Sequence, residues 1–236
     1  MNGFFITGTD TEVGKTWVSA ALIKGLAQQD FHIIARKPVA SGCVWQQNQL
    51  VSEDAQMLHQ ALAQSGQTPP PMQHICHYLF EPPISPARAI RQSTDPQLNR
   101  LRLGDLQQAC LSNIPDADNR PTSRLVVEGA GGFLSPLAPD GLNADLAQML
   151  GLPIILVVGN RLGCLNHALL SLTAIAHRNL ALHAILLNDT QPQADPDNLA
   201  DLTELVKHHS PFPDTPIYHQ AYQSQKNAIA PLIIAA

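Results

Sequence analysis

The sequence has no long apolar run and no cluster of positive charge. No apolar stretch approaches the ~20 residues that a membrane-spanning helix needs. The apolar segment 4–6 is too short for a signal peptide, and polar residues follow it at once. The net charge is −5, and the 14 Lys and Arg residues form no basic stripe. We therefore expect a cytoplasmic protein that binds neither a membrane nor nucleic acid.

Cysteine and histidine occur without the spacing of a metal site. The four cysteines lie too far apart for a Cys-x-x-Cys pair: Cys43, Cys76, Cys110 and Cys164. The histidines, among them the adjacent His208 and His209, show no ligand spacing either. We expect reduced, partly buried thiols rather than a disulfide framework.

Apolar segments alternate with helical patterns along the 236 residues, a length that can bury a sizeable core. Strands are predicted at residues 4–6, 31–35, 125–127, 154–158, 184–187 and 217–218. Helices are predicted at residues 15–28, from Ser52 onward, 103–111, 143–150, 165–176 and 198–208, with a closing helical segment after the last strand. Strands that alternate with helices form a mostly parallel sheet. We predict a single doubly wound α/β domain of P-loop NTPase type over residues 1–236.

The connecting segments differ in character. Residues 36–42 are predicted to form a loop at the carboxyl end of a strand, because they contain proline and glycine. Residues 43–52 read as polar and irregular. The proline-rich stretch 65–86 is predicted to be an ordered excursion from the sheet, and the polar loop through Arg120 and Pro121 is expected at the surface.

The stretch from Gly3 to Thr16 has the order of a phosphate-binding loop. A short buried strand enters a polar loop, and Gly14, Lys15 and Thr16 open a helix. Backbone N–H groups in such a loop hold phosphate oxygens. The lysine reaches the outer phosphates, and the threonine hydroxyl binds Mg²⁺. Five residues rather than four separate Gly8 from Gly14, so the loop is longer than the common pattern.

Lys37 and Ser41 follow the predicted strand 31–35. The ligand crevice of an open parallel sheet lies at the carboxyl ends of its strands. We therefore expect both side chains to face the same crevice as the phosphate loop.

Two carboxylates are candidate metal ligands. Glu128 closes the apolar strand 125–127 before a glycine-rich run, which suits a carboxylate that binds a metal through water, although a lone Glu there is more often a solvated strand end. Asp54 lies in the first turn of a helix that Ser52 can cap, where it could bind a metal or only complement the helix dipole.

Five stretches, taken together, resemble dethiobiotin synthetases, the ATP-dependent cyclo-ligases of biotin synthesis. They are residues 7–16, 37–42, 127–132, 153–159 and 162–168, in this order. The long phosphate loop is this family's own form. The resemblance implies a carbon–nitrogen ligase that uses ATP, Mg²⁺, CO₂ and 7,8-diaminononanoate and closes a ureido ring.

The resemblance also implies roles for individual residues, by position. The implied catalytic residues are Thr11, Lys15 and Lys37. The implied ATP-binding positions are Glu12, Val13, Gly14, Lys15, Thr16 and position 17, which is Trp17. The implied metal ligands are Thr16, Asp54 and Glu128. Ser41 would lie near the reacting carbamate, and Asn188 would read the adenine edge.

The family's enzymes are homodimers in which the substrate carboxylate lies on a helix N-terminus of the other subunit. Residues 163–166, that is Gly163, Cys164, Leu165 and Asn166, occupy that place here, and free N–H groups at a helix start suit a carboxylate. After residue 190 the family usually shows an Ile-Pro-x-Leu segment that lines the nucleoside pocket. This chain has only residues 215–219 there, so the resemblance does not extend to nucleotide selectivity.

The implied reaction brings together two anions, a carbamate and a triphosphate. Catalysis then depends mainly on positioning and on charge neutralisation, which Lys15, Lys37 and Mg²⁺ would supply. We expect Lys37 to bridge the carbamate and the γ-phosphate. The extra loop residue would let Thr11 and Glu12 face the second substrate.

Two other functions share parts of this pattern. A nucleotide-gated dimeric ATPase of partition or regulatory type has a P-loop, but many of these carry a signature lysine where this chain has Asp10. A related amide-forming ligase that acts on a larger carboxylate would usually carry an extra glutaminase domain, for which this chain has no room.

Overall fold

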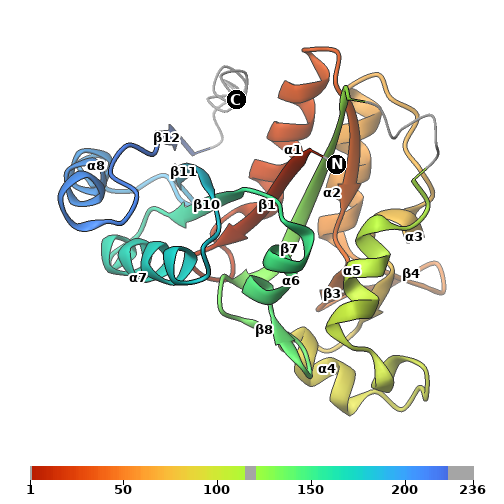
Figure 1. Cartoon of the computed structure of the whole chain (residues 1–236). Helices are drawn as coiled ribbons and strands as arrows, with labels where there is room; N and C mark the ends of the chain where they lie inside the picture. Colours follow the sequence, from red (N-terminus) through yellow and green to blue (C-terminus); the bar gives the residue numbers. More distant parts are fainter. Residues whose placement is uncertain (1, 115–120, 223–236) are drawn as a thin grey trace.

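A computed structural model describes residues 2–114 and 121–222 (Figure 1). Its centre is a six-stranded sheet in the order β12-β11-β10-β1-β7-β2. Every neighbouring pair in this sheet is parallel. The strands are β1 (Gly3–Gly8), β2 (His32–Arg36), β7 (Ser123–Gly132), β10 (Ile154–Gly159), β11 (Leu182–Asn188) and β12 (Ile217–Gln220). This is the parallel sheet that the sequence predicts.

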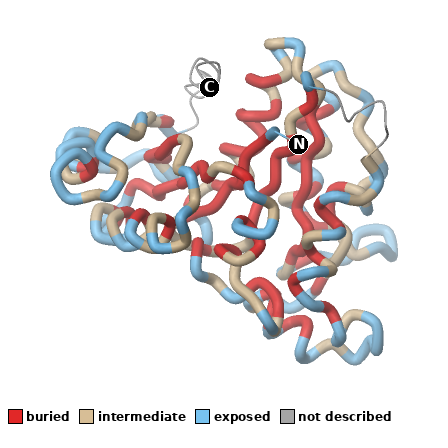
Figure 2. The backbone as a smooth tube through the Cα atoms, viewed as in Figure 1, coloured by how far each residue is buried: buried red, intermediate tan, exposed pale blue. Residues whose placement is uncertain are grey.

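Helices cover both faces of the sheet. They are α1 (Lys15–Ala27), α2 (Glu53–Gln64), α3 (Met72–Ile75), α4 (Pro86–Gln92), α5 (Leu103–Leu111), α6 (Asn143–Leu150), α7 (Cys164–His177) and α8 (Asn198–His209), with a 3-10 turn η1 at Leu98–Arg100. Helices α1, α2 and α3 pack with one apolar cluster, and α4 to α8 pack with the other. The central strands are buried along their whole length (Figure 2), which explains why they show no polar alternation in sequence.

Two of the predicted loops contain short strands. Residues 36–42, expected as loop, include β3 (Val39–Ser41), which pairs with β6 (Tyr78–Phe80) from the proline-rich stretch. Residues 43–52, expected as irregular, form a hairpin of β4 (Val44–Gln46) and β5 (Gln49–Val51). Both predictions were wrong. The proline-rich stretch itself is ordered as predicted, because it carries α3 and β6 and leads into α4.

Strand β7 is longer than predicted and continues through the glycine-rich run. Glu128 was expected to end a strand, but it lies inside β7, opposite Ile6 of β1. The next pair in the ladder joins Gly8 to Gly132, so the register shifts between these two pairs. Two further strands, β8 (Pro136–Ala138) and β9 (Gly141–Leu142), form a small antiparallel ribbon after β7.

All four cysteines are free and buried. In residues 2–114 and 121–222, no helix is both long and apolar enough to span a membrane. The surface position expected for Arg120 and the closing helical segment after residue 222 lie outside the described residues.

The sheet has one point at which the chain order reverses. The chain leaves β1 past β7 toward β2, and it leaves β7 past β1 toward β10, so the connections from these two neighbouring strands run in opposite directions. Ligands of open α/β sheets bind at such a switch point, beyond the carboxyl ends of the strands. The fold therefore places the loop after β1 at the position where a ligand is expected.

Candidate active site

A crevice of about 710 Å³ opens beyond the carboxyl ends of β1, β2 and β7. Its charged and hydroxyl lining includes Lys15, Thr16, Lys37, Asp54 and Glu128. Thr11, Glu12, Gly14, Trp17 and Ser41 also line it, as the sequence predicts for a shared crevice. Five lining residues are apolar: Ala40, Met57, Pro83, Ile84 and Pro86. The proline-rich stretch thus contributes a wall of the crevice, which its sequence pattern did not indicate.

The phosphate loop connects β1 directly to the start of α1. Gly14 precedes the helix in a left-handed conformation, with φ of 89°. The Lys15 ammonium does not extend into solvent, because Nζ donates a hydrogen bond to the Asp10 carbonyl at 2.8 Å. Burial, and next the positive charge of Lys37, lowers the pKa of Lys15 to about 8. Because burial and the charge of Lys37 disfavour the protonated form of Lys15, an anion that enters the loop would stabilise its ammonium.

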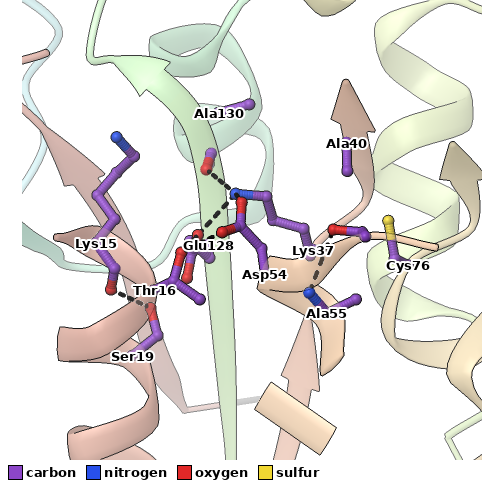
Figure 3. A network of polar contacts seen from close by, with 12 residues as sticks. Lys15, Thr16, Ser19, Lys37, Ala40, Asp54, Ala55, Cys76, Glu128 and Ala130 are labelled. Carbon is purple, nitrogen blue, oxygen red and sulfur yellow. Dashed lines mark hydrogen bonds and ion pairs between the residues drawn. The ribbon is translucent and has the colours of Figure 1, made fainter. Parts of the chain in front are cut away.

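Lys37 is the centre of a buried charge cluster (Figure 3). Its Nζ lies 2.7 Å from Asp54 Oδ2 and 2.7 Å from Glu128 Oε1, and it donates to the Gly129 carbonyl at 3.1 Å. Burial alone lowers the pKa of Lys37, but the two carboxylates outweigh that effect and raise it above its ordinary value. The pKa of Asp54 is likewise held low by Lys37, against the effect of burial. The cluster therefore keeps a cation next to two anions.

Thr16 joins the same two carboxylates. Its Oγ1 lies 2.7 Å from Asp54 Oδ1 and 2.8 Å from Glu128 Oε1, and a hydroxyl has one proton for these two acceptors. Among the described residues, Glu128 Oε2 is buried and has no hydrogen-bond partner. Three hard oxygen donors with one unsatisfied carboxylate oxygen fit Mg²⁺, which binds through one or two carboxylates and substrate phosphates. No group of three or more His, Cys, Asp or Glu side chains suited to a metal occurs in the described part of the chain.

Asn143 fixes the glycine-rich part of β7 below the crevice. Its side chain is fully buried, accepts from the Ala130 N–H at 3.0 Å and donates to the Ala130 and Gly132 carbonyls. A Cβ on Gly129 would lie 2.5 Å from Asn143 Oδ1, so this position requires glycine. Sequence reasoning missed Asn143, which appeared there only as the first residue of a helix.

Asn188, predicted to read the adenine edge, lies at the carboxyl end of β11 against the phosphate loop. Its Nδ2 donates to the Val13 carbonyl at 3.0 Å. A Cβ on Gly14 would lie 2.2 Å from that nitrogen, which explains glycine at a position that also has a positive φ. The observed contact of Asn188 is structural, and its role toward adenine stays a prediction.

The start of α7, predicted to hold a substrate carboxylate, lies outside the crevice of its own chain. Residues 163–166 do not line that crevice. The Cys164 side chain is buried, and its N–H donates to the Arg161 carbonyl at 2.9 Å. The structure thus brings the predicted phosphate and metal residues together in the crevice, except for Val13, which is buried in the core, and it leaves this helix start separate.

Comparison with known proteins gives close relatives over almost the whole chain. A family model described as an AAA domain matches residues 2–213. The chain is 38% identical over 233 residues to the ATP-dependent dethiobiotin synthetase BioD of Ralstonia nicotianae, covering 97% of this chain and 96% of that protein. The protein of the same name from Pseudomonas paraeruginosa is 40% identical over 208 residues, 86% of this chain and 85% of that protein.

A third relative of this name, from Idiomarina loihiensis, is 38% identical over 209 residues, 87% of this chain and 89% of its own length. Among solved structures, the signal recognition particle receptor FtsY from Elizabethkingia anophelis aligns with 96% of this chain and 61% of its own, at 11% identity and a TM-score of 0.47. Identity and coverage with the three synthetases show that the chain belongs to the ATP-dependent dethiobiotin synthetase family.

Proposed function

We propose that the chain is an ATP-dependent ligase that makes dethiobiotin from 7,8-diaminononanoate, CO₂ and ATP. The observation that carries the proposal is the crevice in which Lys15 of a phosphate loop and Lys37 of a buried charge cluster lie together. Family membership supplies the substrates. We also propose that residues 1–236 form one domain.

The reaction has three steps. One amine of the diamine adds to CO₂ and loses a proton, which gives a carbamate. A carbamate oxygen attacks the γ-phosphorus and breaks its bond to the ADP oxygen, which forms a carbamic–phosphoric anhydride. The second amine then attacks the carbamoyl carbon, expels phosphate and closes the five-membered ring.

The side chains of the crevice would act mainly through charge and position. Lys37, already bonded to two carboxylates, would place its ammonium between the carbamate and the γ-phosphate. Lys15 would bind the outer phosphates from the start of α1, and Thr11 and Ser41 would contact the reacting groups. Residues 12–17 would hold the nucleotide.

Thr16, Asp54 and Glu128 would hold Mg²⁺, and the ion would neutralise charge on the phosphates. The unpartnered Oε2 of Glu128 supports this assignment. For the base, Asn188 is the proposed contact, although its side chain already donates to the phosphate loop.

We propose a homodimer in which the start of α7 serves the partner's substrate. Residues 163–166 lie away from the crevice of their own chain, so they are free to serve another. Large apolar side chains are exposed nearby: Leu134 at 52%, Leu162 at 102% and Leu170 at 61%. Such side chains around one shallow hollow, which Leu134 and Leu170 line, suit a protein contact.

Phosphate release from Mg²⁺ and ATP, measured with and without the diamine plus bicarbonate, tests the function. A synthetase releases phosphate only when the diamine and bicarbonate are both present. The second candidate, a nucleotide-gated ATPase, would hydrolyse ATP without the diamine. Asp10, at the place of that class's signature lysine, is held by an arginine of its own chain, which counts against this alternative.

A further inference from the structure

The phosphate loop is tied to the rest of the fold by a side chain that lies outside it. Arg161, in the turn between β10 and α7, places Nη2 2.6 Å from Asp10 Oδ2. We propose that Arg161 is a positioning residue for nucleotide binding, and that it acts through Asp10. The inference deepens the proposed function, because it concerns how that site takes its triphosphate.

Asp10 holds two groups that face the nucleotide. Its Oδ1 accepts from the Thr11 N–H at 2.8 Å and from Thr11 Oγ1 at 3.3 Å. Its backbone carbonyl accepts from Lys15 Nζ at 2.8 Å. The carboxylate is therefore divided, with one oxygen bonded inside the loop and the other bonded to Arg161. A rotation of the Asp10 side chain would release Thr11, and a shift of the Asp10 backbone would displace the Lys15 ammonium.

The backbone next to Arg161 is held in place by hydrogen bonds of its neighbour Asn160. The preceding residue, Asn160, is 1% exposed, and its Nδ2 donates to Asp189 Oδ1 at 2.8 Å and to the Asp195 carbonyl at 2.9 Å. Its Oδ1 accepts from Asn198 Nδ2 at 2.8 Å. These bonds join the turn after β10 to the end of β11 and the start of α8. Through its ion pair with Asp10, Arg161 thus connects the phosphate loop to the hydrogen-bonded segment around Asn160.

Charge gives a second reason for the pair. An unpaired carboxylate in a loop that must accept a polyanion would repel it, and Arg161 neutralises this carboxylate. Burial raises the pKa of Asp10, but the hydrogen bond from the Thr11 N–H, and next the positive charge of Arg161, outweigh that effect and lower it. Asp10 therefore stays ionised and needs its partner.

The pair contributes little to the stability of the fold. Its side chains are 41% and 49% exposed, and exposed ion pairs contribute roughly 0.2–1 kcal/mol. A small displacement of a binding group, by contrast, can lower a rate by about 10²-fold. The effect of breaking the pair should therefore appear in nucleotide binding and leave the melting temperature nearly unchanged.

The test is the affinity for a non-hydrolysable ATP analogue with Mg²⁺, measured by calorimetry. We expect Arg161→Ala to weaken binding about tenfold, and Arg161→Lys to recover most of the loss. Asp10→Asn combined with Arg161→Ala should be no worse than the weaker-binding single variant, because both break one interaction. Binding of the analogue does not depend on which reaction follows, so failure of the proposed function would leave this result standing.

Arg178→Ala is the matched control. Arg178 makes an ion pair with Asp145 at the far end of α7 from the phosphate loop, and this pair is also partly exposed, at 30% and 32%. We expect its affinity to stay within about twofold of the unmodified chain. Equal affinities of Arg161→Ala and Arg178→Ala would overturn the proposal. So would a loss of binding in Arg161→Ala that comes with a melting temperature well below that of Arg178→Ala.

Discussion

The two halves of the sheet's carboxyl edge are built from different chemistry. At the ends of β1, β7 and β2 the polar groups are charged: Lys37 and Glu128 are buried, and the partly exposed Asp54 pairs with Lys37. Beyond β10 and β11 they are mainly neutral amides, Asn160 and Asn188. Each half is densely hydrogen-bonded, so the difference concerns the kind of bond rather than the degree of order.

Charge and amide suit different tasks. Buried charges are costly unless paired, and their partners can be exchanged for other ions that enter the site. Neutral amides make fixed hydrogen bonds and offer an entering anion no net charge. The charged half is therefore suited to the reacting groups, and the amide half is suited to holding loops in place.

Removing the central cation should have the largest effect. We predict that Lys37→Ala lowers kcat by about 10²-fold or more, because a preorganised charge partner is lost. Steady-state kinetics on protein whose fold is verified by circular dichroism would measure this. Turnover near the level of the unmodified chain would contradict the role of Lys37.

Removing one negative charge should change the metal dependence. Glu128→Gln keeps the shape of the side chain but loses a hard anionic oxygen, so we expect the Mg²⁺ concentration for half-maximal activity to rise at least about tenfold. Glu53→Gln, an exposed neighbour of Asp54 at the start of α2, is the control. If the metal titration is unchanged, Glu128 is not a ligand.

Substitutions in the amide half should lower the free energy of unfolding more than they lower activity. Asn160→Ala removes three side-chain hydrogen bonds from a buried site, and we expect a loss of about 2 kcal/mol in the free energy of unfolding. Urea denaturation would measure it. A variant as stable as the unmodified chain would show that the hydrogen bonds of Asn160 do not stabilise the fold.

A smaller effect is expected on the stability of the fold at acidic pH. Burial lowers the pKa of His183, which packs against Phe4 with ring centroids 4.7 Å apart. The unfolded chain therefore binds the proton at a higher pH than the folded chain, so stability falls as the pH drops through about 6.5. In His183→Phe the fall in melting temperature between about pH 7.5 and pH 5 should be smaller. An equal fall in both proteins would assign the acid sensitivity elsewhere.

The charged half could be predicted largely from sequence, and the amide half could not. Lys15 and Thr16 open a helix just after a buried strand, and Glu128 follows an apolar run, although β7 continues beyond it. The carboxyl ends of strands in a parallel sheet meet at one edge. Ser52 was predicted to cap α2, and its Oγ accepts from the Ala55 N–H at 3.3 Å. Local patterns of this kind are visible in a single sequence.

Asn143 and Asn160 depend on partners that no local pattern reveals. The partners of Asn160 lie 29 to 38 residues further along the chain. The hairpin β4–β5 was missed for another reason: each strand has only three residues and most of them are exposed, so the run is too short to show an alternation of buried and exposed positions. Its turn residues Gln47 and Asn48 both have positive φ, and only the asparagine suggests such a turn in sequence.

The register shift between β1 and β7 has a geometric meaning. From Ile6 to Gly8 strand β1 advances by two residues, while its neighbour advances by four, from Glu128 to Gly132. At about 3.3 Å per residue, β7 holds about 7 Å of backbone without a counterpart on β1. This surplus must leave the plane of the sheet, and it does so beside the phosphate loop. The size of this bulge beside the crevice depends on the number of residues between two paired positions. A side-chain substitution would therefore leave the bulge in place, whereas an insertion or deletion in β7 would change it.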